Sequence, residues 1–516
     1  MTRLDIIGGG PAGAFTARLA ALRYPDWEVR LFERLAPDDT FGFGVGLTHA
    51  LLEAVHKADP AIHQRLLAAT LKFSSAEFRV DAGTTNFLQF HSGAIRRSEL
   101  LRILLEGAAD AGAEVNIGSV VHVDDVREGA DIVVGADGLS SSTRTRFEPQ
   151  FGVTTTLGRG VFIWCAADIE LEGTVFQPVD TPAGTFVMHA YPYSKGLSTF
   201  VIEASLETIE RAGFTDRDWT SDGASDDEAL DYLSEAFAKV LMGARFFGNR
   251  SRWSHFTTLQ CRNWSYQNVV LIGDAVATVH PSLGSGTKVA MESAIALVDQ
   301  LKAVGSETPH KVLLEYTRSR RRQVQRLQDR AQRSQLWWES FTNRKEMSAP
   351  RLAFAYLSRA GVVSLDRLAA TDPALVAQAA ADFSGAAPTA VPSRDLTPWV
   401  LRQPFDTTEL TLPTRVLASG VDGATPIEVT SGDAWGPDGD DYVRQVRNQL
   451  QNGTHVVTLT GGNDRGAIMD RLAVAERVKL ETHGVVAIRA SADHDDLVAD
   501  GILAGRADLV QLDSDA

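Results

Sequence analysis

The 516-residue sequence predicts an α/β fold in which a strand–helix domain is interleaved with a mixed-sheet domain and followed by a small βαβ-type domain. Three observations predict this organisation. Strand and helix patterns alternate from residue 1 to about 150, strand-like segments with turn signals fill about 160–256, and strand and helix patterns alternate again from 456 onward. The length is compatible with about three domains at ~150 residues each.

The first strand–helix turn has the glycine spacing of a dinucleotide-binding fingerprint. An apolar run at 4–7 stops at glycines spaced G-x-G-x-x-G, and a helix pattern follows. Glycine permits the tight turn and the approach of a pyrophosphate to the backbone, and the helix N-terminus presents free N–H groups to phosphate. Glu33 closes the next strand, where its carboxylate can accept both ribose hydroxyls. The residues of this Rossmann-like site are expected to be Gly8, Gly10, Ala12, Gly13, Glu33 and Arg34.

Two later segments resemble a flavin-binding family. Asp137-Gly138 begins a loop that continues to Arg144 (the DG loop, 137–144), and Gly273-Asp274 begins the GD loop. Both resemble motifs of the single-component (group A) flavoprotein aromatic hydroxylases, as does R-x-x-L-x-x-x-L starting at Arg97. In that family the GD aspartate binds the ribityl chain of FAD. The resemblance covers about residues 1–345.

The family also implies where the flavin ring lies. Residues 281–286 read P-x-x-G-x-G (the flavin loop), which in the family lies along the isoalloxazine ring. This loop opens a helix expected at 287–301, whose N-terminal dipole favours negative charge at the flavin N1/C2 carbonyl end. The resemblance implies further FAD contacts at Gly44, Val45, Arg97, Asp137, Asp274, Gly284, Gly286 and Thr287, and catalytic positions at His280, Pro281 and Gly284.

Four stretches, at 41–45, 189–193, 198–203 and 285–292, resemble one branch of the family. This branch contains salicylyl-CoA 5-hydroxylase and 2-aminobenzoyl-CoA monooxygenase/reductase, and the violacein-pathway indole hydroxylase is similar. The branch implies an NADH- or NADPH-dependent monooxygenase, whose C4a-hydroperoxyflavin attacks an aromatic carbon para or ortho to an OH or NH₂ group. Candidate substrate-side residues on the interrupting sheet are Trp164, His189 and Tyr191.

The branch points to a 2-aminobenzoyl or salicylyl thioester hydroxylated at C5. Whether its carrier is coenzyme A or an acyl-carrier protein stays open, as does an indole or tryptophan-derived alkaloid. A non-oxygenating flavin reductase or dehydrogenase and a non-catalytic flavin-binding scaffold are the remaining alternatives.

The composition excludes several classes of function. A formal net charge of −16 disfavours nucleic acid as a partner. No run of ~18 apolar residues exists, and a core strand begins near the N-terminus, so we expect neither a membrane span nor a signal peptide. Two cysteines, Cys165 and Cys261, fit a reducing cytoplasm and offer no disulfide framework or metal cluster. We expect a cytoplasmic protein without a metal ion.

Arginine is concentrated between residues 318 and 333. Four arginines recur every four residues and therefore share one helical face; we call Arg318, Arg322, Arg326 and Arg330 the arginine row. The favoured interpretation is a solvated helix face, and the alternative is that the row binds the phosphates of coenzyme A or an acidic carrier protein. An apolar cluster at 336–341 is interpreted as core or dimer contact.

The C-terminal sequence predicts a separate βαβαβ unit. Strands are expected at 456–459, 485–488 and 509–512, with helices at 465–482 and 495–503. Segments 410–416 and 504–510 resemble the opening and the end of an old-yellow-enzyme barrel. Because only about 115 residues follow the expected linker, against ~250 in a TIM barrel, we interpret this unit as a degenerate remnant without FMN. Its apolar faces are expected to be covered by packing or by a homodimer contact.

The expected domain boundaries follow from these patterns. The cofactor domain is expected in two parts, and the divisions are 1–159 (first FAD-binding part), 160–260 (substrate-binding mixed sheet), 261–385 (second FAD-binding part and helical region), 386–400 (linker) and 401–516 (barrel remnant).

Overall fold

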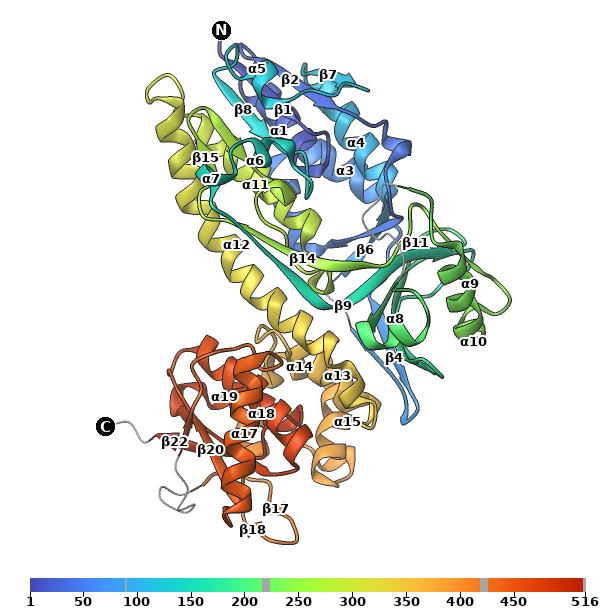
Figure 1. Ribbon diagram of the computed structural model, residues 1–516, viewed down its shortest axis with the longest axis vertical. Helices are drawn as coiled ribbons and strands as arrows, with labels where there is room; N and C mark the ends of the chain where they lie inside the picture. The colour runs from blue at the N-terminus through green and yellow to red at the C-terminus, as the bar shows by residue number, and fades with distance from the viewer. Residues whose placement is uncertain (89–90, 216–222, 418–425, 514–516) are drawn as a thin grey trace. The chain divides into compact units, whose positions relative to one another are not determined.

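The computed structural model describes residues 1–88, 91–215, 223–417 and 426–513, which form two compact units (Figure 1). The first unit comprises Met1–Ala76 and Gln89–Gln335, and the second comprises Glu77–Leu88 and Leu336–Ala516. The helices between 336 and 385, which the sequence assigned to the cofactor domain, therefore cluster with the C-terminal part. The five-part division remains a proposal.

A parallel sheet forms the centre of the cofactor region in the first unit. Its order is β15-β16-β8-β1-β2-β7, and β16, β8, β1, β2 and β7 are parallel neighbours. β1, β8 and β16 are buried apolar runs, as expected for strands covered on both faces. The strands are β1 (Arg3–Ile7), β2 (Glu28–Glu33), β7 (Glu114–Ile117), β8 (Ile132–Gly135), β15 (Ser265–Tyr266) and β16 (Val269–Leu271).

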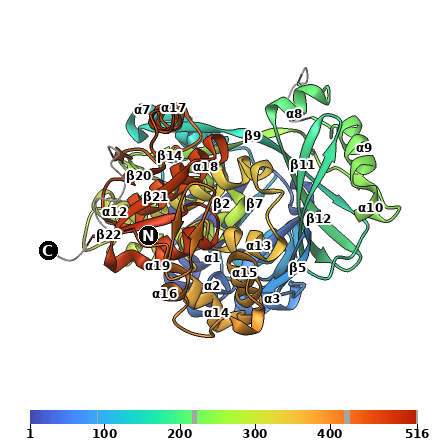
Figure 2. The same cartoon turned by 90° about the horizontal axis from the view of Figure 1, so that it is seen from below.

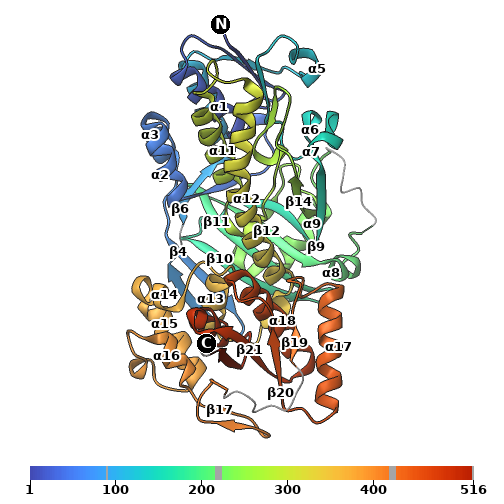
Figure 3. The ribbon, with the colours of Figure 1, turned by 90° about the vertical axis from the view of Figure 1, so that its left-hand side faces the viewer.

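Three helices cover the motif-bearing strands. α1 (Pro11–Arg23) packs against both α4 (Arg97–Asp110) and α11 (Gly286–Leu301), and Figure 3 shows α1 beside α11. α1 is buried from Ala12 through Ala21, because small residues let its neighbours approach from several sides. The helix predicted at 287–301 is confirmed as α11.

The second sheet of the first unit interrupts the cofactor region, as the sequence predicts. Its order is β13-β9-β12-β11-β10, with β14 also pairing with β9, and these pairings are antiparallel. Helices α8 (Leu206–Arg211), α9 (Asp227–Ala236) and α10 (Ala238–Leu241) share its hydrophobic core (Figure 2). The strands are β9 (Val153–Ala167), β10 (Thr174–Thr181), β11 (Gly184–Ser194), β12 (Leu197–Ser205), β13 (Phe246–Phe247) and β14 (Ser254–Cys261).

One helix of this region differs from the sequence expectation. The sequence pattern at 228–240 is typical of one continuous helix, but α9 and α10 are separated at Phe237, whose φ of −97° and ψ of 19° leave the helical conformation. The Phe237 side chain is buried in the sheet core, so packing outweighs helix continuity here. The polar, glycine-containing segment 216–227, whose composition is typical of a loop, lies mostly outside the described residues.

The second unit contains the predicted βαβαβ pattern. β20 (Val456–Thr460), β21 (Val485–Ser491) and β22 (Leu509–Asp513) are parallel neighbours, joined by α18 (Arg465–Thr482) and α19 (Asp495–Leu503). All five predicted elements are confirmed. A fourth parallel strand, β19 (Ile427–Glu428), precedes them through α17 (Pro437–Gln451) and pairs with β20.

The helices before this sheet are ordered and packed. Four helices lead toward it: α13 (Ala349–Ser358), α14 (Leu365–Thr371), α15 (Pro373–Ser384) and α16 (Leu396–Leu401). α16 begins within the segment expected as a linker and ends one residue beyond it, and it packs on α19 because Leu396 and Val400, four residues apart, form a buried face. Trp337, Trp338 and Phe341 are buried together, so the apolar cluster is core.

Candidate active site

Four segments meet at one edge of the parallel sheet in the first unit. β16, β8, β1 and β2 are parallel neighbours, so the chain leaves all four strands at the same edge. The GD loop follows β16, the DG loop follows β8, the fingerprint turn (8–13) follows β1, and Glu33 ends β2. Ligands of open parallel sheets bind in the crevice at this edge. Strand order alone therefore brings the three sequence motifs together.

The fingerprint turn depends on two glycines and stays open at a third. Gly8 has a φ of +104°, and a Cβ atom there would lie 2.4 Å from the carbonyl oxygen of Ala136. A Cβ atom on Gly13 would lie 1.9 Å from the carbonyl oxygen of Gly8. No atom lies within 4 Å of the Cβ position of Gly10. Gly8 and Gly13 are thus required to build the turn, and Gly10 leaves its outer side accessible to a ligand.

The N-terminus of α1 is free of competing anions. No side chain caps it, Pro11 stands at its start, and no acidic residue lies in its first turn. Its N–H groups and positive dipole end are therefore available to a pyrophosphate. Glu33 accepts hydrogen bonds from the amides of Gly9 at 2.5 Å and Leu35 at 2.8 Å. A carboxylate has about four acceptor positions, so Glu33 can also accept ribose hydroxyls.

The DG loop is built by Asp137. Its carboxylate accepts hydrogen bonds from the Ser141 hydroxyl at 2.5 Å and the Thr143 amide at 3.0 Å. Arg144 then donates to the carbonyl oxygen of Ala275 at 3.0 Å, which ties the DG loop to the GD loop. The contacts of Asp137 within its own loop give it a structural role, and its direct contact with FAD remains a prediction.

Asp274 and Arg97 interact although they come from different motifs. Burial raises the pKa of Asp274, and the positive charge of Arg97 offsets part of this effect. Burial likewise lowers the pKa of Arg97, with Asp274 acting in the opposite direction. The guanidinium of Arg97 lies 4.5 Å from the centre of the Phe41 ring and donates to the Thr40 hydroxyl at 3.1 Å. Although the surrounding protein desolvates Asp274 enough to raise its pKa, the residue still reaches the surface, so its carboxylate can accept the hydroxyls of a ribityl chain.

The flavin loop is shaped by His280 and Gly284. Nδ1 of His280 accepts a hydrogen bond from the amide of Ser282 at 3.3 Å, which caps the short turn Pro281–Leu283. Gly284 has a φ of +60° and ends this turn. His280 is buried and its ring packs against Phe256 at 4.1 Å. The structure therefore gives His280 a loop-positioning role, and its catalytic assignment remains a prediction.

The helix after the flavin loop also begins without a cap. Ser285 makes no side-chain hydrogen bond to the first turn of α11, and this first turn contains no acidic residue. No atom lies within 4 Å of the Cβ position of Gly286, and Thr287 beside it is partly exposed. This second open helix N-terminus lies where the sequence places the flavin N1/C2 carbonyl end.

Two predicted cofactor residues belong to β3 (Gly44–Thr48), which pairs with β6 (His91–Arg96). A Cβ atom on Gly44 would lie 2.3 Å from Cβ of Tyr193, so this glycine is required by packing against β11. Val45 follows it and is partly buried. Arg34, the remaining predicted contact, is exposed after β2. Contacts of these residues with FAD remain predictions.

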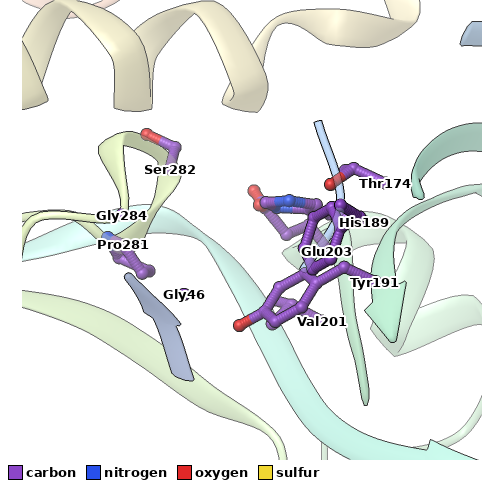
Figure 4. A pocket seen from close by; sticks show the side chains of 10 residues that line it. Gly46, Thr174, His189, Tyr191, Val201, Glu203, Pro281, Ser282 and Gly284 are labelled. Atoms are coloured by element: carbon purple, nitrogen blue, oxygen red, sulfur yellow. The ribbon is translucent and has the colours of Figure 1, made fainter. Parts of the chain in front are cut away.

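A pocket lies between the flavin loop and strands β11 and β12 (Figure 4). Two of the three predicted substrate residues, His189 and Tyr191, line it together with Pro281 and Gly284. Trp164 is not among the residues that line it. Its indole N–H donates to the Thr199 hydroxyl at 2.6 Å, and its ring contacts Phe41 and Phe43, so it supports the segment before β3.

Sequence reasoning missed six of the ten residues that line the pocket. The strand alternation that places His189 and Tyr191 on one face also places Val201 and Glu203 there, because Val201 is the register partner of His189. The alternation was visible in the sequence, but these residues could be assigned to the pocket only once the pairing of β11 with β12 was known. The additional lining residues are Gly46, Phe73, Thr174, Val201, Glu203 and Ser282.

The residues at the sheet edge fit FAD. The open turn at Gly10, the two open helix N-termini and the carboxylates of Glu33 and Asp274 match its pyrophosphate, flavin, ribose and ribityl groups. A family model described as "FAD binding domain" matches residues 1–331. The chain belongs to this family.

Relatives of known activity refine the assignment. The chain is 34% identical to salicyloyl-CoA 5-hydroxylase from Streptomyces sp, over 98% of this chain and 99% of that protein. It is 36% identical to 3-hydroxy-4-methyl-anthranilyl-[aryl-carrier protein] 5-monooxygenase from Streptosporangium sibiricum, over 71% of this chain and 97% of that protein. The protein is an FAD-dependent aromatic hydroxylase, a class that uses NADH or NADPH as co-substrate.

A solved structure agrees in fold. The tetrameric form of 2-methyl-3-hydroxypyridine-5-carboxylic acid oxygenase matches with a TM-score of 0.52 and 21% identity, over 70% of this chain and 96% of that chain. In the part of the chain that the structure describes, no helix is long and apolar enough to cross a membrane.

Proposed function

We propose that the enzyme hydroxylates the ring of a 2-aminobenzoyl or salicylyl thioester at C5, para to the amino or hydroxyl group. The observation that carries this proposal is the pocket, in which aromatic side chains of β11 stand opposite the flavin loop (Figure 4). A ring held there presents one edge to Pro281 and Gly284. The names of the two relatives support the substrate class, since both denote 5-hydroxylation of an ortho-substituted benzoyl thioester.

The chain's own contribution is to orient the ring and exclude water. Bound FAD supplies the chemistry that inserts one oxygen atom from O₂, using electrons from NADH or NADPH. Phe73 lies parallel to Tyr191 at a ring distance of 6.2 Å, and Phe176 packs on His189 at 4.6 Å, so the aromatic wall is held in place. A fixed wall keeps the attacked carbon in a reactive position. Burial raises the pKa of Tyr191, whose hydroxyl donates to the Gly44 carbonyl at 3.0 Å.

The arginine row supports coenzyme A as the carrier. Its four side chains are exposed on α12 (Pro309–Glu339), and Arg318 pairs with Glu315. In the described ranges no carboxylate forms an ion pair with Arg322, Arg326 or Arg330. Three unpaired guanidinium groups in a chain of charge −16 indicate an anionic ligand.

The helix that carries the row contacts a residue that lines the pocket. The hydroxyl of Ser334, one turn after Arg330, lies 2.5 Å from that of Ser282, which lines the pocket. From Ser334 to Arg322 the helix extends about 18 Å at ~1.5 Å per residue, a distance that an extended pantetheine arm can span. The relative that shares nearly the full length of this chain is the one named for a coenzyme A thioester.

The substrate is tested by steady-state assays with product analysis. NADH and NADPH oxidation, with product mass, is measured for free 2-aminobenzoate, the 2-aminobenzoyl and salicylyl coenzyme A thioesters, the carrier-protein thioester and an indole. We expect stimulation and a mass gain of one oxygen atom with a coenzyme A thioester. Turnover of the indole alone would overturn the thioester proposal and leave the hydroxylase assignment intact.

The carrier is tested by removing charges from the row. Replacing Arg322, Arg326 and Arg330 together by alanine should raise KM for the coenzyme A thioester about tenfold, at ~0.5 kcal/mol per exposed contact. KM for the corresponding pantetheine thioester, which lacks the nucleotide phosphates, should not change. Arg318→Ala is the matched control, because its charge is already paired. An equal rise for both thioesters would contradict phosphate binding by the row.

We also propose that the C-terminal βα units are a shortened old-yellow-enzyme-like barrel. β19, β20, β21 and β22 follow one another in strand order, as barrel strands do. Val416 forms a parallel bridge to Val510, with the Leu417 amide donating to the Val510 carbonyl at 2.8 Å. The first and last strands of a closed barrel pair in this way. Val416 and Val510 belong to the two segments that resemble the opening and the end of such a barrel, and Leu417 adjoins the first of them. We predict one FAD and no FMN per chain, measurable by extracting the flavins.

Two further properties complete the proposal. Both cysteines are free and buried, which supports a reducing compartment and hence the cytoplasm. A homodimer is tested by measuring the mass of the holoenzyme in solution.

A further inference from the structure

Among the described residues that line the pocket, Glu203 is the only carboxylate (Figure 4). It lies on β12, opposite Val187 of β11 and Phe162 of β9. All other residues of β12 are uncharged. Figure 4 shows Glu203 on the same side of the pocket as His189 and Tyr191, across from Pro281 and Gly284 of the flavin loop.

Glu203 is a polar group on a largely apolar part of the sheet. Its register partners Val187 and Phe162 and the nearby Val201 are apolar. A partly buried carboxylate that lines a pocket beside the flavin loop is one of the few polar groups there that can fix a ligand's orientation. The pocket faces an aromatic ring whose reactivity depends on an OH or NH₂ substituent, and a carboxylate is the natural acceptor for either.

Two other polar groups of the pocket are less suited to this task. The hydroxyl proton of Tyr191 is already donated to the Gly44 carbonyl. The His189 ring packs against Phe176 at 4.6 Å between ring centres, which restricts its movement. A carboxylate has about four acceptor positions, so Glu203 can accept a substrate proton in addition to contacts with its neighbours.

We propose that Glu203 accepts the hydrogen bond of the ring OH or NH₂ group and takes up its proton during hydroxylation; this rests on the proposed function. As the carbon para to this group forms its bond to oxygen, electron density leaves the donor atom, and its O–H or N–H proton moves to the carboxylate. The hydroxylated carbon then loses its hydrogen as a proton to water, the electron pair of the broken C–H bond restores the aromatic ring, and Glu203 returns its proton to the donor atom. The oxygen atom and the reducing equivalents come from the established reaction.

The test compares rings with and without the donor group. Binding of the 2-aminobenzoyl, salicylyl and unsubstituted benzoyl coenzyme A thioesters to the oxidised holoenzyme is measured by flavin absorbance. In the wild type we expect the donor-bearing ligands to bind at least tenfold more tightly, as for a hydrogen bond to a charged group. Glu203→Gln should remove most of this preference, lower kcat more than it raises KM, and increase the peroxide released per NAD(P)H oxidised.

A matched control separates donor recognition from pocket shape. Val201→Ala removes an apolar group from the same strand and the same pocket, so it should weaken all three ligands alike and keep the preference. FAD content and thermal midpoint verify that each variant is folded. If Glu203→Gln keeps the preference and the coupling of the wild type, the proposal is wrong while the hydroxylase function stands. If no thioester is hydroxylated by the wild type, the substrate proposal fails instead.

Discussion

Two strand–helix turns in this protein begin with the same kind of sequence and end differently. In the first unit Gly8, Gly9 and Gly10 lead from β1 into α1, and in the second unit Gly461 and Gly462 lead from β20 into α18. Both first glycines have positive φ, +104° and +155°. Both turns lie at the carboxyl end of a parallel strand, where ligands commonly bind.

The helix caps distinguish the two turns. α1 has no side-chain cap, so its amides face outward for a pyrophosphate. At α18 the carboxylate of Asp464 accepts hydrogen bonds from the amides of Gly466 at 2.8 Å and Ala467 at 3.1 Å. That cap satisfies the donors a phosphate would use and adds a negative charge. A glycine-rich turn thus becomes an anion site only when its helix is left uncapped.

The space beside each first glycine also differs. A Cβ atom on Gly8 would meet backbone atoms at Ala136, so the first turn is packed by main chain. A Cβ atom on Gly461 would lie 2.8 Å from the backbone oxygen of Val429 and 2.8 Å from Nη1 of Arg471, a buried side chain of α18 that donates to the Gly462 carbonyl at 2.7 Å. In the second unit a side chain therefore supports the turn in addition to the main chain.

The largest expected effect is at Gly13. Gly13→Val places a Cβ atom 1.9 Å from the backbone oxygen of Gly8, which cannot move aside. We expect FAD to be lost and the unit to be destabilised by about 1–3 kcal/mol, as for overpacking. The FAD-to-protein ratio after purification, with the calorimetric thermal midpoint, measures both effects.

Gly10→Ala is the matched control for this turn. Its Cβ atom enters open space, so the fold and the thermal midpoint should be preserved. Any loss of FAD in this control would then report crowding of the cofactor itself. Yellow, stable Gly13→Val protein would show that the turn is not built as described.

The second prediction concerns Asp274. Asp274→Ala removes a charged acceptor for the ribityl hydroxyls, which corresponds to about 1.5–3 kcal/mol and therefore to at least a tenfold weaker FAD affinity. Titration of the apoenzyme with FAD, followed by fluorescence quenching, measures it. Asp137→Asn serves as the comparison, because its contacts lie within the DG loop and should lower stability more than FAD affinity. Wild-type affinity in Asp274→Ala would place the ribityl chain elsewhere.

The sequence predicted the parts of this site that depend on local rules. The fingerprint turn, the start of α11 and every element from β20 to β22 follow from glycine spacing and hydrophobic periodicity, which act over a few residues. The convergence of the DG and GD loops followed from the family resemblance and is explained by the order β16-β8-β1.

The remaining features depend on pairing between distant segments. Glu203 could not be placed in the pocket before the register of β11 and β12 was known. Trp164 looked like a substrate residue, but its indole is used to hold the chain near Phe43. His280 stands beside the loop proline in sequence, yet its ring points into a contact with Phe256. Side-chain direction, which sequence does not reveal, decided all three.

The third prediction tests the capped turn. Asp464→Ala removes the N-cap of α18 and should lower the stability of the second unit by about 1 kcal/mol, the usual effect of losing such a cap. FAD content and affinity should be unchanged, because this turn does not bind the cofactor. Calorimetry and FAD titration of the same preparation measure the two properties. A loss of FAD affinity in this variant would contradict the assignment of the cofactor to the first turn alone.

The smallest expected effect is at Arg471, whose side chain contacts the capped turn. Burial lowers the pKa of Arg471, while Asp464, Asp470 and Asp513 act in the opposite direction. Among the described residues, Nε and Nη2 have no hydrogen-bond partner, so their desolvation opposes the attraction of the carboxylates. Arg471→Met removes both the desolvation cost and the attraction of the carboxylates, and it keeps most of the side-chain volume. We therefore expect the free energy of unfolding to change by less than about 1 kcal/mol. A loss of about 3 kcal/mol or more would mean that Arg471 acts as a paired charge. A second measurement adds inorganic phosphate to the wild type and to Arg471→Met. Because the cap occupies the α18 amides, phosphate should raise the thermal midpoint of neither protein. A rise confined to the wild type would show that this turn is an anion site.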